Sequence, residues 1–303
     1  MGFRCIFNNL TVGFWNIQGM TEKVNSCKLD KIKDPIFRNI LKTFDILCLQ
    51  ETHLSQEEDI PPIEGYVPIP HCRRMSGNNR YFGGMLLLIR SSIRSGVKIM
   101  HTFDEDDLEV TLGKLFFGLT EDIKILFTYA SPINSCYTKA RTINILEKIE
   151  TQYIDGGNNY IIMGDLNGRT KLGEDFVRDD GDDHSPINIP SYNKGSQLNR
   201  QNMDDHNIDT QGKLILETCK TSALRILNGR TTEDDIGKFT RYPTNLDDKP
   251  SVIDYALCSE PLLKEIPQFR VLPFSGMSDH CCISLKLLTN KVKSCMYNPQ
   301  KMP

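Results

Sequence analysis

The sequence favours a layered α/β sandwich over a barrel of parallel strands. Strand-like and helix-like segments are mixed along the chain without strict alternation. The 303 residues, 39% of them hydrophobic and 25% charged, suffice for one large domain with a sizeable core. The longest apolar runs, such as residues 85–89, are far shorter than the ~20 residues that span a bilayer, so no membrane helix is expected.

Apolar periodicity assigns the elements of the first half. Ile32, Ile36, Phe37, Ile40 and Leu41 recur at helical spacing and predict a helix over 30–44. Apolar runs bounded by turn residues predict strands at 11–17, 45–49, 85–90, 97–101, 110–117 and 123–129.

In the second half, the same patterns predict helices at 140–154 and 213–222. Strands are predicted at 160–163, 225–228, 237–242, 252–257 and 282–287. The polar stretch 168–209 is expected to be a long loop, and such loops are usually functional or mobile. We expect one domain over residues 1–288 and a tail or linker over 289–303.

Charge and cysteine content bear on partners and compartment. The formal net charge of −3 does not by itself indicate a nucleic-acid binder. Residues 65–103 contain no acid, so they form either a phosphate-binding face or an ordinary solvated surface. Their cations include Arg73, Arg74, Arg80, Arg90, Arg94 and Lys98. The ten cysteines form no CxxC pair, which favours buried thiols in a reducing compartment over a disulfide or zinc framework.

Polar side chains stand at the ends of four predicted strands. They are Asn16, Glu51, Asp165 with Asn167, and Asp279 with His280. A fifth candidate, Asp254, lies within an apolar run, where an unpaired carboxylate costs several kcal/mol. Its natural partner is a histidine, and His280 is adjacent to another acid in a strand context. Each of these residues alone could be a cap or turn residue, but five such positions together indicate a shared site.

The donor types in this set point to phosphate chemistry. Carboxylate and amide oxygens without histidine–cysteine clusters favour Mg²⁺ or Mn²⁺ over zinc. A His–Asp pair orients the imidazole and raises its basicity, so that it can donate to a phosphoryl oxygen. A further carboxylate can polarise a water for in-line attack on phosphorus.

Five motifs occur here in the order of the endonuclease/exonuclease/phosphatase superfamily, which the chain resembles over roughly residues 10–288. The motifs are Trp15-Asn16-Ile17-Gln18-Gly19, Leu49-Gln50-Glu51-Thr52, Gly164-Asp165-Leu166-Asn167, Ser251-Val252-Ile253-Asp254-Tyr255 and Ser278-Asp279-His280. Residues 164–170 and 224–230 most resemble the apurinic-type endonuclease domain of non-LTR (LINE-like) retrotransposons. The resemblance implies a four-layer α/β sandwich, with two mixed β-sheets packed face to face and helices outside.

The resemblance further implies Mg²⁺-dependent hydrolysis of phosphodiester bonds, with Mn²⁺ as the alternative metal. Glu51 would be the principal metal ligand, with Asn16 as its neighbour. Asp279 would be a metal ligand or an acid just behind the ligands.

The same resemblance implies the catalytic residues. Asp165 would orient or deprotonate the attacking water, and Asn167 would contact the phosphate. Asp254 would be the partner of His280, which would contact the scissile phosphate. Tyr129 would be the active-site phenol, or else only an aromatic residue at a strand end.

One segment departs from the cellular abasic-site endonucleases. Phe239-Thr240-Arg241-Tyr242 stands where those enzymes carry a tryptophan-rich segment, and the residues before Asp254 lack their common arginine. Thr240 and Arg241 are therefore expected to bind substrate through backbone or groove contacts rather than in a pocket for an abasic sugar.

The resulting hypothesis is a Mg²⁺-dependent endonuclease that nicks duplex DNA in the manner of a retrotransposon at its target site. The alternatives are an abasic-site repair endonuclease, another superfamily phosphodiesterase or phosphatase, and a domesticated, catalytically silent nucleic-acid-binding domain. The expected partners are DNA and a reverse transcriptase domain C-terminal in a parent polyprotein, with no membrane contact. The protein is expected to be a monomer and intracellular, in the nucleus if it is retrotransposon-derived.

Overall fold

A computed structural model describes residues 9–24, 27–54, 60, 62–72, 83–100, 107–132, 145–150, 159–177, 199–245 and 247–290. Several expectations fall outside these residues. They include most of the predicted helix 140–154, the middle of the 168–209 stretch, the three arginines Arg73, Arg74 and Arg80, and the tail from residue 291 onward.

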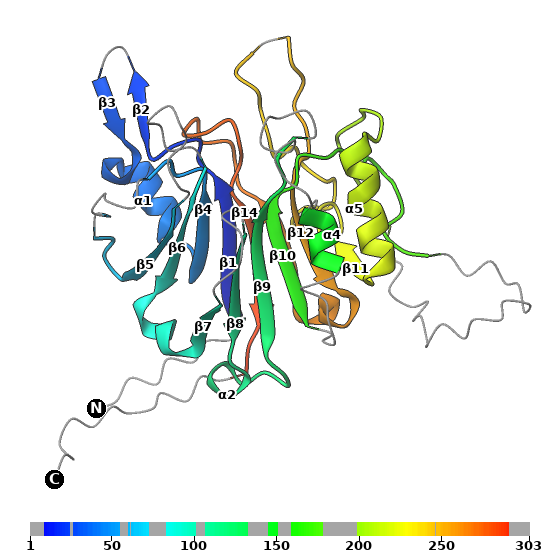
Figure 1. Ribbon diagram of the computed structural model, residues 1–303, viewed down its shortest axis with the longest axis horizontal. Helices are drawn as coiled ribbons and strands as arrows, with labels where there is room; N and C mark the ends of the chain where they lie inside the picture. The colour runs from blue at the N-terminus through cyan, green and yellow to red at the C-terminus, as the bar shows by residue number, and fades with distance from the viewer. Residues whose placement is uncertain are drawn as a thin grey trace, which may run out of the picture.

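The strands form two six-stranded sheets that stand side by side in Figure 1. The first sheet has the order β13-β14-β1-β4-β6-β5. Its strands are β1 (Asn9–Asn16), β4 (Ile46–Gln50), β5 (Tyr66–His71), β6 (Met85–Arg90), β13 (Gln268–Val271) and β14 (Ile283–Leu288). Strands β1 and β4 run parallel, and the other neighbours run antiparallel, so the sheet is mixed.

The second sheet has the order β11-β12-β10-β9-β8-β7. Its strands are β7 (Val97–Met100), β8 (Asp107–Leu112), β9 (Ile123–Tyr129), β10 (Tyr160–Asp165), β11 (Leu224–Ile226) and β12 (Asp254–Ser259). It is also mixed, because β9 and β10 are parallel while the other pairs are antiparallel. A small hairpin of β2 (Thr21–Val24) and β3 (Cys27–Asp30) stands apart from both sheets.

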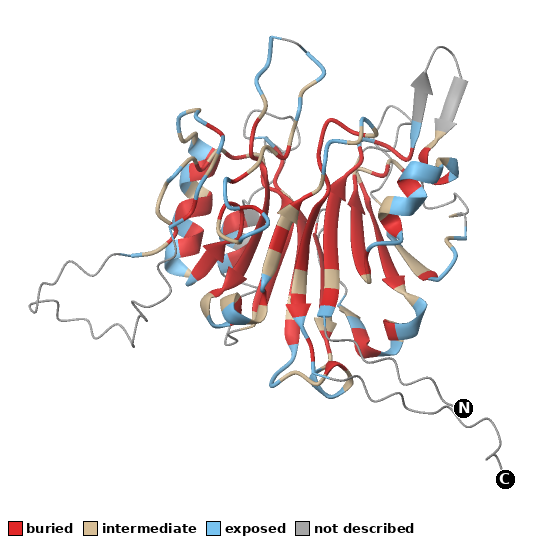
Figure 2. Cartoon of the chain, turned by 180° about the vertical axis from the view of Figure 1, so that it is seen from behind, coloured by how far each residue is buried: buried red, intermediate tan, exposed pale blue. Residues whose placement is uncertain are grey.

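Helices lie on the outer side of each sheet, and further short helices lie at the lower ends of the strands (Figure 1). The helices are η1 (Lys31–Lys33), α1 (Pro35–Leu41), η2 (Ser91–Gly96), α2 (Lys114–Phe117), α4 (Ile145–Lys148), α5 (Thr210–Thr221) and η5 (Glu260–Glu265). Helix α1 packs on the first sheet, and α4 and α5 pack on the second. A third apolar core fills the space between the sheets, and Figure 2 shows the buried residues concentrated in these strands. The predicted four-layer α/β sandwich is therefore confirmed.

The apolar runs follow from burial on both faces of each sheet. In β4, Ile46 and Cys48 enter the core between the sheets, while Leu47 and Leu49 pack toward α1. Successive side chains of a strand point to opposite faces, so a strand covered on both sides needs an apolar residue at every position. Helix α1 begins where Asp34 accepts hydrogen bonds from two backbone N–H groups of the first turn.

Two of the predicted strands were wrong in part. The predicted strand 110–117 ends at Leu112, and Lys114–Phe117 form α2 instead. Gly113 caps that helix, and Gly118 ends it at a φ of 66°, a left-handed conformation that glycine adopts without strain. The predicted strand 237–242 is irregular, with isolated bridges that join Arg241 to Ser251 and to His280.

Three further differences concern position within the sheets. Asp254 is the first residue of β12 and not a mid-strand residue, so it lies at the edge where the polar residues gather. Strand β5 was not predicted because Pro68 and Pro70 interrupt its pattern, and the sheet order places it at an edge, where proline is tolerated. Strand β13 is too short to stand out by periodicity. In the described part of the chain, no helix has the length and apolar character needed to cross a membrane.

Candidate active site

The predicted site residues come together because of the sheet topology. Parallel strands end at the same edge of a sheet, so β1 and β4 bring Asn16 and Glu51 together, and β9 and β10 bring Tyr129 and Asp165 together. Strand β12 runs the other way, and its first residue, Asp254, lies directly opposite Asp165. This edge, where β1, β4, β9 and β10 end and β12 begins, is the upper edge in Figure 1.

Two of these strand ends carry the same local turn. The side-chain oxygen of Asn16 accepts a hydrogen bond from the Gln18 N–H at 3.1 Å, and that of Asp165 accepts one from the Asn167 N–H at 3.1 Å. Gln18 and Asn167 both have a φ of 48°, and Glu51 has a φ of 52°. These left-handed conformations are uncommon for residues with side chains, and strained backbone of this kind clusters at active sites. The turns fix the direction in which Asn16 and Asp165 point.

Asn16 joins the two sheets. Its Nδ2 atom donates to Glu51 Oε1 at 3.1 Å and to Asp165 Oδ2 at 3.2 Å. Asn16 and Asp165 are buried, whereas the Glu51 side chain is 22% exposed. The amide thus holds two carboxylates from different sheets close together, and Glu51 is the one that solvent or a ligand can reach.

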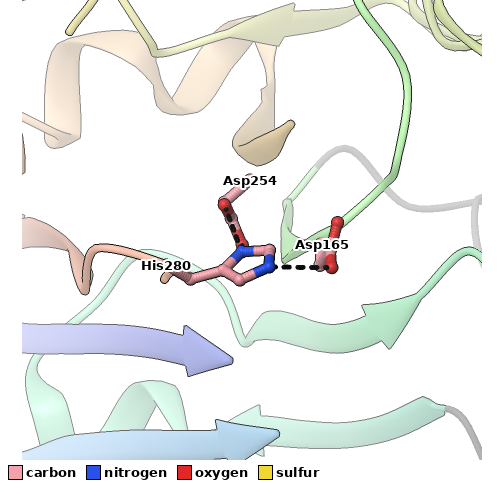
Figure 3. A group of neighbouring side chains, drawn as sticks. All are labelled: Asp165, Asp254 and His280. Carbon is pink, nitrogen blue, oxygen red and sulfur yellow. Dashed lines mark hydrogen bonds and ion pairs between the residues drawn. The ribbon is translucent and has the colours of Figure 1, made fainter. Parts of the chain in front are cut away.

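His280 is held between carboxylates, as Figure 3 shows. Its Nδ1 atom lies 2.9 Å from Asp254 Oδ2, and its Nε2 atom lies 3.9 Å from Asp165 Oδ2 and 3.6 Å from Asp279 Oδ1. The carboxylate of Asp254 therefore keeps a proton on Nδ1 and leaves Nε2 facing the other two acids. The predicted pairing of Asp254 with His280 is confirmed.

The close spacing of these groups shifts two pKa values upward. Burial, followed by the charges of Asp254 and Glu51, raises the pKa of Asp165 to about 8, although His280 and Asn16 act against this. Burial works against protonation of His280, but the charges of Asp254, Asp165 and Asp279 outweigh it and raise the pKa of His280 to about 10. Groups whose pKa values are strongly shifted by burial and by neighbouring charges are typical of acid–base sites.

The remaining predicted residues lie around this centre. Tyr129 is half-buried in register with Asp165, and the half-buried Asn167 donates from Nδ2 to the Ala130 carbonyl at 3.0 Å. Arg241 Nε donates to Asp279 Oδ2 at 2.9 Å, and its side chain is 31% exposed. The Oδ1 atom of Asp279 is buried without a hydrogen-bond partner among the described residues.

Thr240 has a different place from the one expected. It is buried, and its hydroxyl accepts hydrogen bonds from the Ile253 and Asp254 N–H groups, both at 3.0 Å. It therefore positions the start of β12, and its buried side chain is not available to a substrate.

Three nearby residues were missed from the sequence. His53 Nε2 lies 3.9 Å from Glu51 Oε2, and Gln18 Oε1 accepts a long hydrogen bond of 3.5 Å from the Asp279 N–H. The buried Lys31 donates to the Ile17 carbonyl at 2.5 Å. The adjacency of Gln18 and His53 to the motif residues Asn16 and Glu51 is the signal that could have found them.

A second acidic cluster, Asp204 with Asp205 and His206, lies outside this centre. Asp204 is buried and accepts hydrogen bonds from the Val252 N–H at 3.0 Å and from the His206 N–H at 3.1 Å. These contacts attach the 199–209 segment to the residues that precede β12. The buried Asp204 therefore has a structural role.

Comparisons with known proteins place the chain in a family. The Endonuclease/Exonuclease/phosphatase family model matches residues 13–280. A search of curated proteins finds no match to the sequence.

Solved structures share the fold over almost the whole chain. The endonuclease domain of TRAS1, a telomere-specific non-LTR retrotransposon, is 14% identical with a TM-score of 0.55, over 92% of this chain and 98% of that one. The AP endonuclease of Leishmania major is 15% identical with a TM-score of 0.63, over 95% and 92%. The 3′-5′ exonuclease of Neisseria meningitidis is 14% identical with a TM-score of 0.58, over 92% and 99%. At these identities the likeness shows the fold alone.

Members of the matched family hydrolyse phosphodiester bonds, and its nucleases typically depend on a divalent metal. The matched region runs from within β1 to His280 and so contains all the motif residues that meet at the strand ends. By this match the chain belongs to the endonuclease/exonuclease/phosphatase family.

Proposed function

We propose that this protein is a Mg²⁺-dependent endonuclease that nicks duplex DNA and leaves a 3′-hydroxyl. The observation that supports the proposal is the continuous chain of contacts from Glu51 through Asn16 and Asp165 to His280 and Asp254. It places an exposed carboxylate, a buried carboxyl of raised pKa and an oriented imidazole around one point, as hydrolysis of a phosphodiester requires.

The donor set fits a hard divalent cation. Glu51 offers a partly exposed carboxylate, and the Oδ1 atom of Asp279 is buried without a hydrogen bond among the described residues. Asn16 presents its amide nitrogen to both carboxylates, so it acts as a ligand only if the amide is turned over. Glu51 and Asp279 would therefore hold Mg²⁺ or Mn²⁺, and Asn16 would orient Glu51 beside them. When bound, the ion neutralises charge that develops on the phosphate oxygens.

The two titrating groups would divide the proton chemistry. Asp254 fixes the His280 ring, and the raised pKa keeps the imidazole protonated at neutral pH, so its Nε2–H can donate to a phosphate oxygen. Asp165, whose carboxylate lies 3.9 Å from that nitrogen, can accept the proton of the attacking water when it is ionised. Asn167 and Tyr129 flank Asp165 and would contact the phosphate.

Arg241 would contribute to substrate binding. Its Nε atom donates to Asp279, which holds the half-buried side chain in place. Its backbone pairs with that of His280 in an isolated β-bridge. A guanidinium held at one nitrogen keeps its other N–H donors for a phosphate of the substrate strand. This supports contact with the DNA backbone beside the scissile phosphate.

The retrotransposon type of nicking also belongs to the proposal. The fold shared with the TRAS1 endonuclease domain supports this type. The proposal further includes DNA as the partner, a reverse transcriptase domain in a parent polyprotein, a monomeric state and a nuclear location. The Leishmania major AP endonuclease has the same fold, so preference for abasic DNA is the competing outcome that an experiment must separate.

The test is the nicking of supercoiled plasmid DNA with Mg²⁺ and with EDTA. We expect open-circle product that depends on Mg²⁺ and that is lost in Glu51→Gln. The matched control is Glu217→Gln, an exposed glutamate on α5, which should nick as the wild type does. Nicking in EDTA, or no loss in Glu51→Gln, would contradict the proposal.

A further inference from the structure

The Tyr255 side chain lies behind the site, in the apolar core between the second sheet and α5. Tyr255 follows Asp254 in β12, so its side chain points to the opposite face of the sheet from the one where Asp254 meets His280. The side chain is fully buried. A buried hydroxyl costs free energy unless it is hydrogen-bonded, so the bonds of this group indicate its role.

The Tyr255 hydroxyl bonds to the turn that follows Asn167. It donates to the Gly168 carbonyl at 2.8 Å and accepts from the Thr170 N–H at 3.3 Å. The Val252 carbonyl, 2.7 Å away, is a second acceptor for the same proton. Burial raises the pKa of Tyr255, so the hydroxyl keeps the proton that it donates.

This turn has a strained backbone that needs such support. Asn167 has a φ of 48° and Lys171 a φ of 44°. Left-handed residues with side chains persist only where the surrounding structure fixes them. On the other side of the turn, Asp209 at the start of α5 accepts a hydrogen bond from the Arg169 N–H at 3.1 Å. The turn is therefore held between β12 and α5.

The same turn carries two groups of the site. The Asn167 N–H donates to Asp165 Oδ1 at 3.1 Å, and Asn167 Nδ2 donates to the Ala130 carbonyl at 3.0 Å. A turn that relaxes would therefore move the Asn167 amide relative to the Asp165 carboxylate. Displacement of a positioned group by about 1 Å can lower a rate ~10²-fold. Because Tyr255 is adjacent to Asp254, its hydroxyl also connects the turn to the strand that orients His280.

We propose that Tyr255 is a positioning residue for phosphodiester hydrolysis, whose hydroxyl keeps the Asn167 turn in the conformation that presents Asn167 to the phosphate. This inference rests on the proposed function and adds to it a residue that acts on the reaction without touching the substrate. Since Tyr255 acts through Asn167, its loss should lower kcat, and the Mg²⁺ concentration for half-maximal nicking should not change.

The experiment measures kcat and KM for nicking of supercoiled plasmid in Mg²⁺, together with urea unfolding of each protein. The variants are Tyr255→Phe, Asn167→Ala and the double variant. The matched control is Tyr66→Phe. The Tyr66 hydroxyl is also buried and also donates to two backbone carbonyls, those of Leu41 and Phe44, but it lies in β5 at the edge of the first sheet.

The expected result separates positioning from stability. Tyr255→Phe should lower kcat roughly 10- to 100-fold with KM near the wild-type value, whereas Tyr66→Phe should keep the wild-type kcat. Both variants should lose similar stability, because each loses one buried hydroxyl. In the Asn167→Ala background, Tyr255→Phe should change kcat by less than about twofold, because the group through which it acts is gone.

The outcomes also separate this inference from the proposed function. A kcat for Tyr255→Phe that matches Tyr66→Phe, or an equal loss with and without Asn167, overturns the positioning role and leaves the endonuclease assignment standing. A wild type that does not nick DNA overturns the proposed function itself.

A second variant reaches the same turn from α5 if Tyr255→Phe does not fold. In Asp209→Ser, the serine can still cap the helix, but its shorter side chain loses the Arg169 N–H. The same fall in kcat, and the same dependence on Asn167, are expected. A wild-type kcat in Asp209→Ser would count against the role of the turn.

Discussion

The Asp254–His280 pair gives a prediction that can be measured without substrate. Asp254 is fully buried, and its Oδ2 lies 2.9 Å from His280 Nδ1. Asn at position 254 keeps the shape and an acceptor but removes the charge. A buried hydrogen bond to a charged group contributes about 1.5–3 kcal/mol, which corresponds to roughly one to two pKa units on His280.

The sign of the effect on stability follows from proton linkage. The pKa of His280 in the folded protein, about 10, lies above the ordinary histidine value of about 6.5. The stabilisation by this pair is therefore complete below pH about 6.5 and is lost as the pH rises through about 10. Asp254 also raises the pKa of Asp165, so the loss of Asp254 lowers the pKa of both groups. Both groups therefore make the stability difference between wild type and variant smaller as the pH rises.

The assay is urea unfolding of wild type and Asp254→Asn between pH 6 and pH 10, in EDTA so that no metal shifts the result. The difference in unfolding free energy should be about 1.5–3 kcal/mol near pH 6 and should shrink toward pH 10. In Mg²⁺, the alkaline limb of the nicking profile should also move to lower pH in the variant. A difference in stability that stays constant across this range would refute the reasoning.

Three further predictions concern the site and its scaffold. Glu51→Ala and Asp165→Ala should each lower nicking turnover by ~10²–10⁴, and nearly full activity in both would contradict the site assignment. Gly164→Ala should cost about 1–3 kcal/mol of stability and should also lower nicking. The added Cβ would collide with the Thr128 carbonyl in β9 and displace the neighbouring Asp165. Gly113→Ala is the control, because a Cβ at Gly113 meets only ordinary van der Waals contact. On matched duplexes at equal ionic strength, a single abasic analogue should change nicking by less than ~100-fold, or ~2.7 kcal/mol, and a larger preference would favour the repair assignment.

Apolar pattern alone misassigned two segments. The apolar run 110–117 looks like one strand, but Gly113 and Gly118 convert its second half into α2. The run 237–242 forms no regular strand, and its backbone bonds to Ser251 and to residues 279–281 at only a few positions. Propensity is a weak prior at such places, since the available pairing partner decides the outcome.

The sequence by itself predicted the sandwich architecture and the polar residues that meet at the strand ends. Apolar runs that stop at Asn16, Glu51, Asp165 and His280 indicate where strands meet polar segments. Polar side chains are costly inside a buried strand, so they mark the strand ends and indicate which functional groups gather there. The pairing of Asp254 with His280 could also be inferred, since a buried carboxylate needs a partner.

Only the tertiary structure decided how these groups contact one another. The orientation of the Asn16 amide, the ion pair of Arg241 with Asp279 and the packing of Tyr242 on Phe274 each join segments that are more than 30 residues apart. No local period encodes such contacts. They arise because the parallel pairs β1–β4 and β9–β10 end at one edge of the sandwich, where β12 and the residues before β14 also arrive.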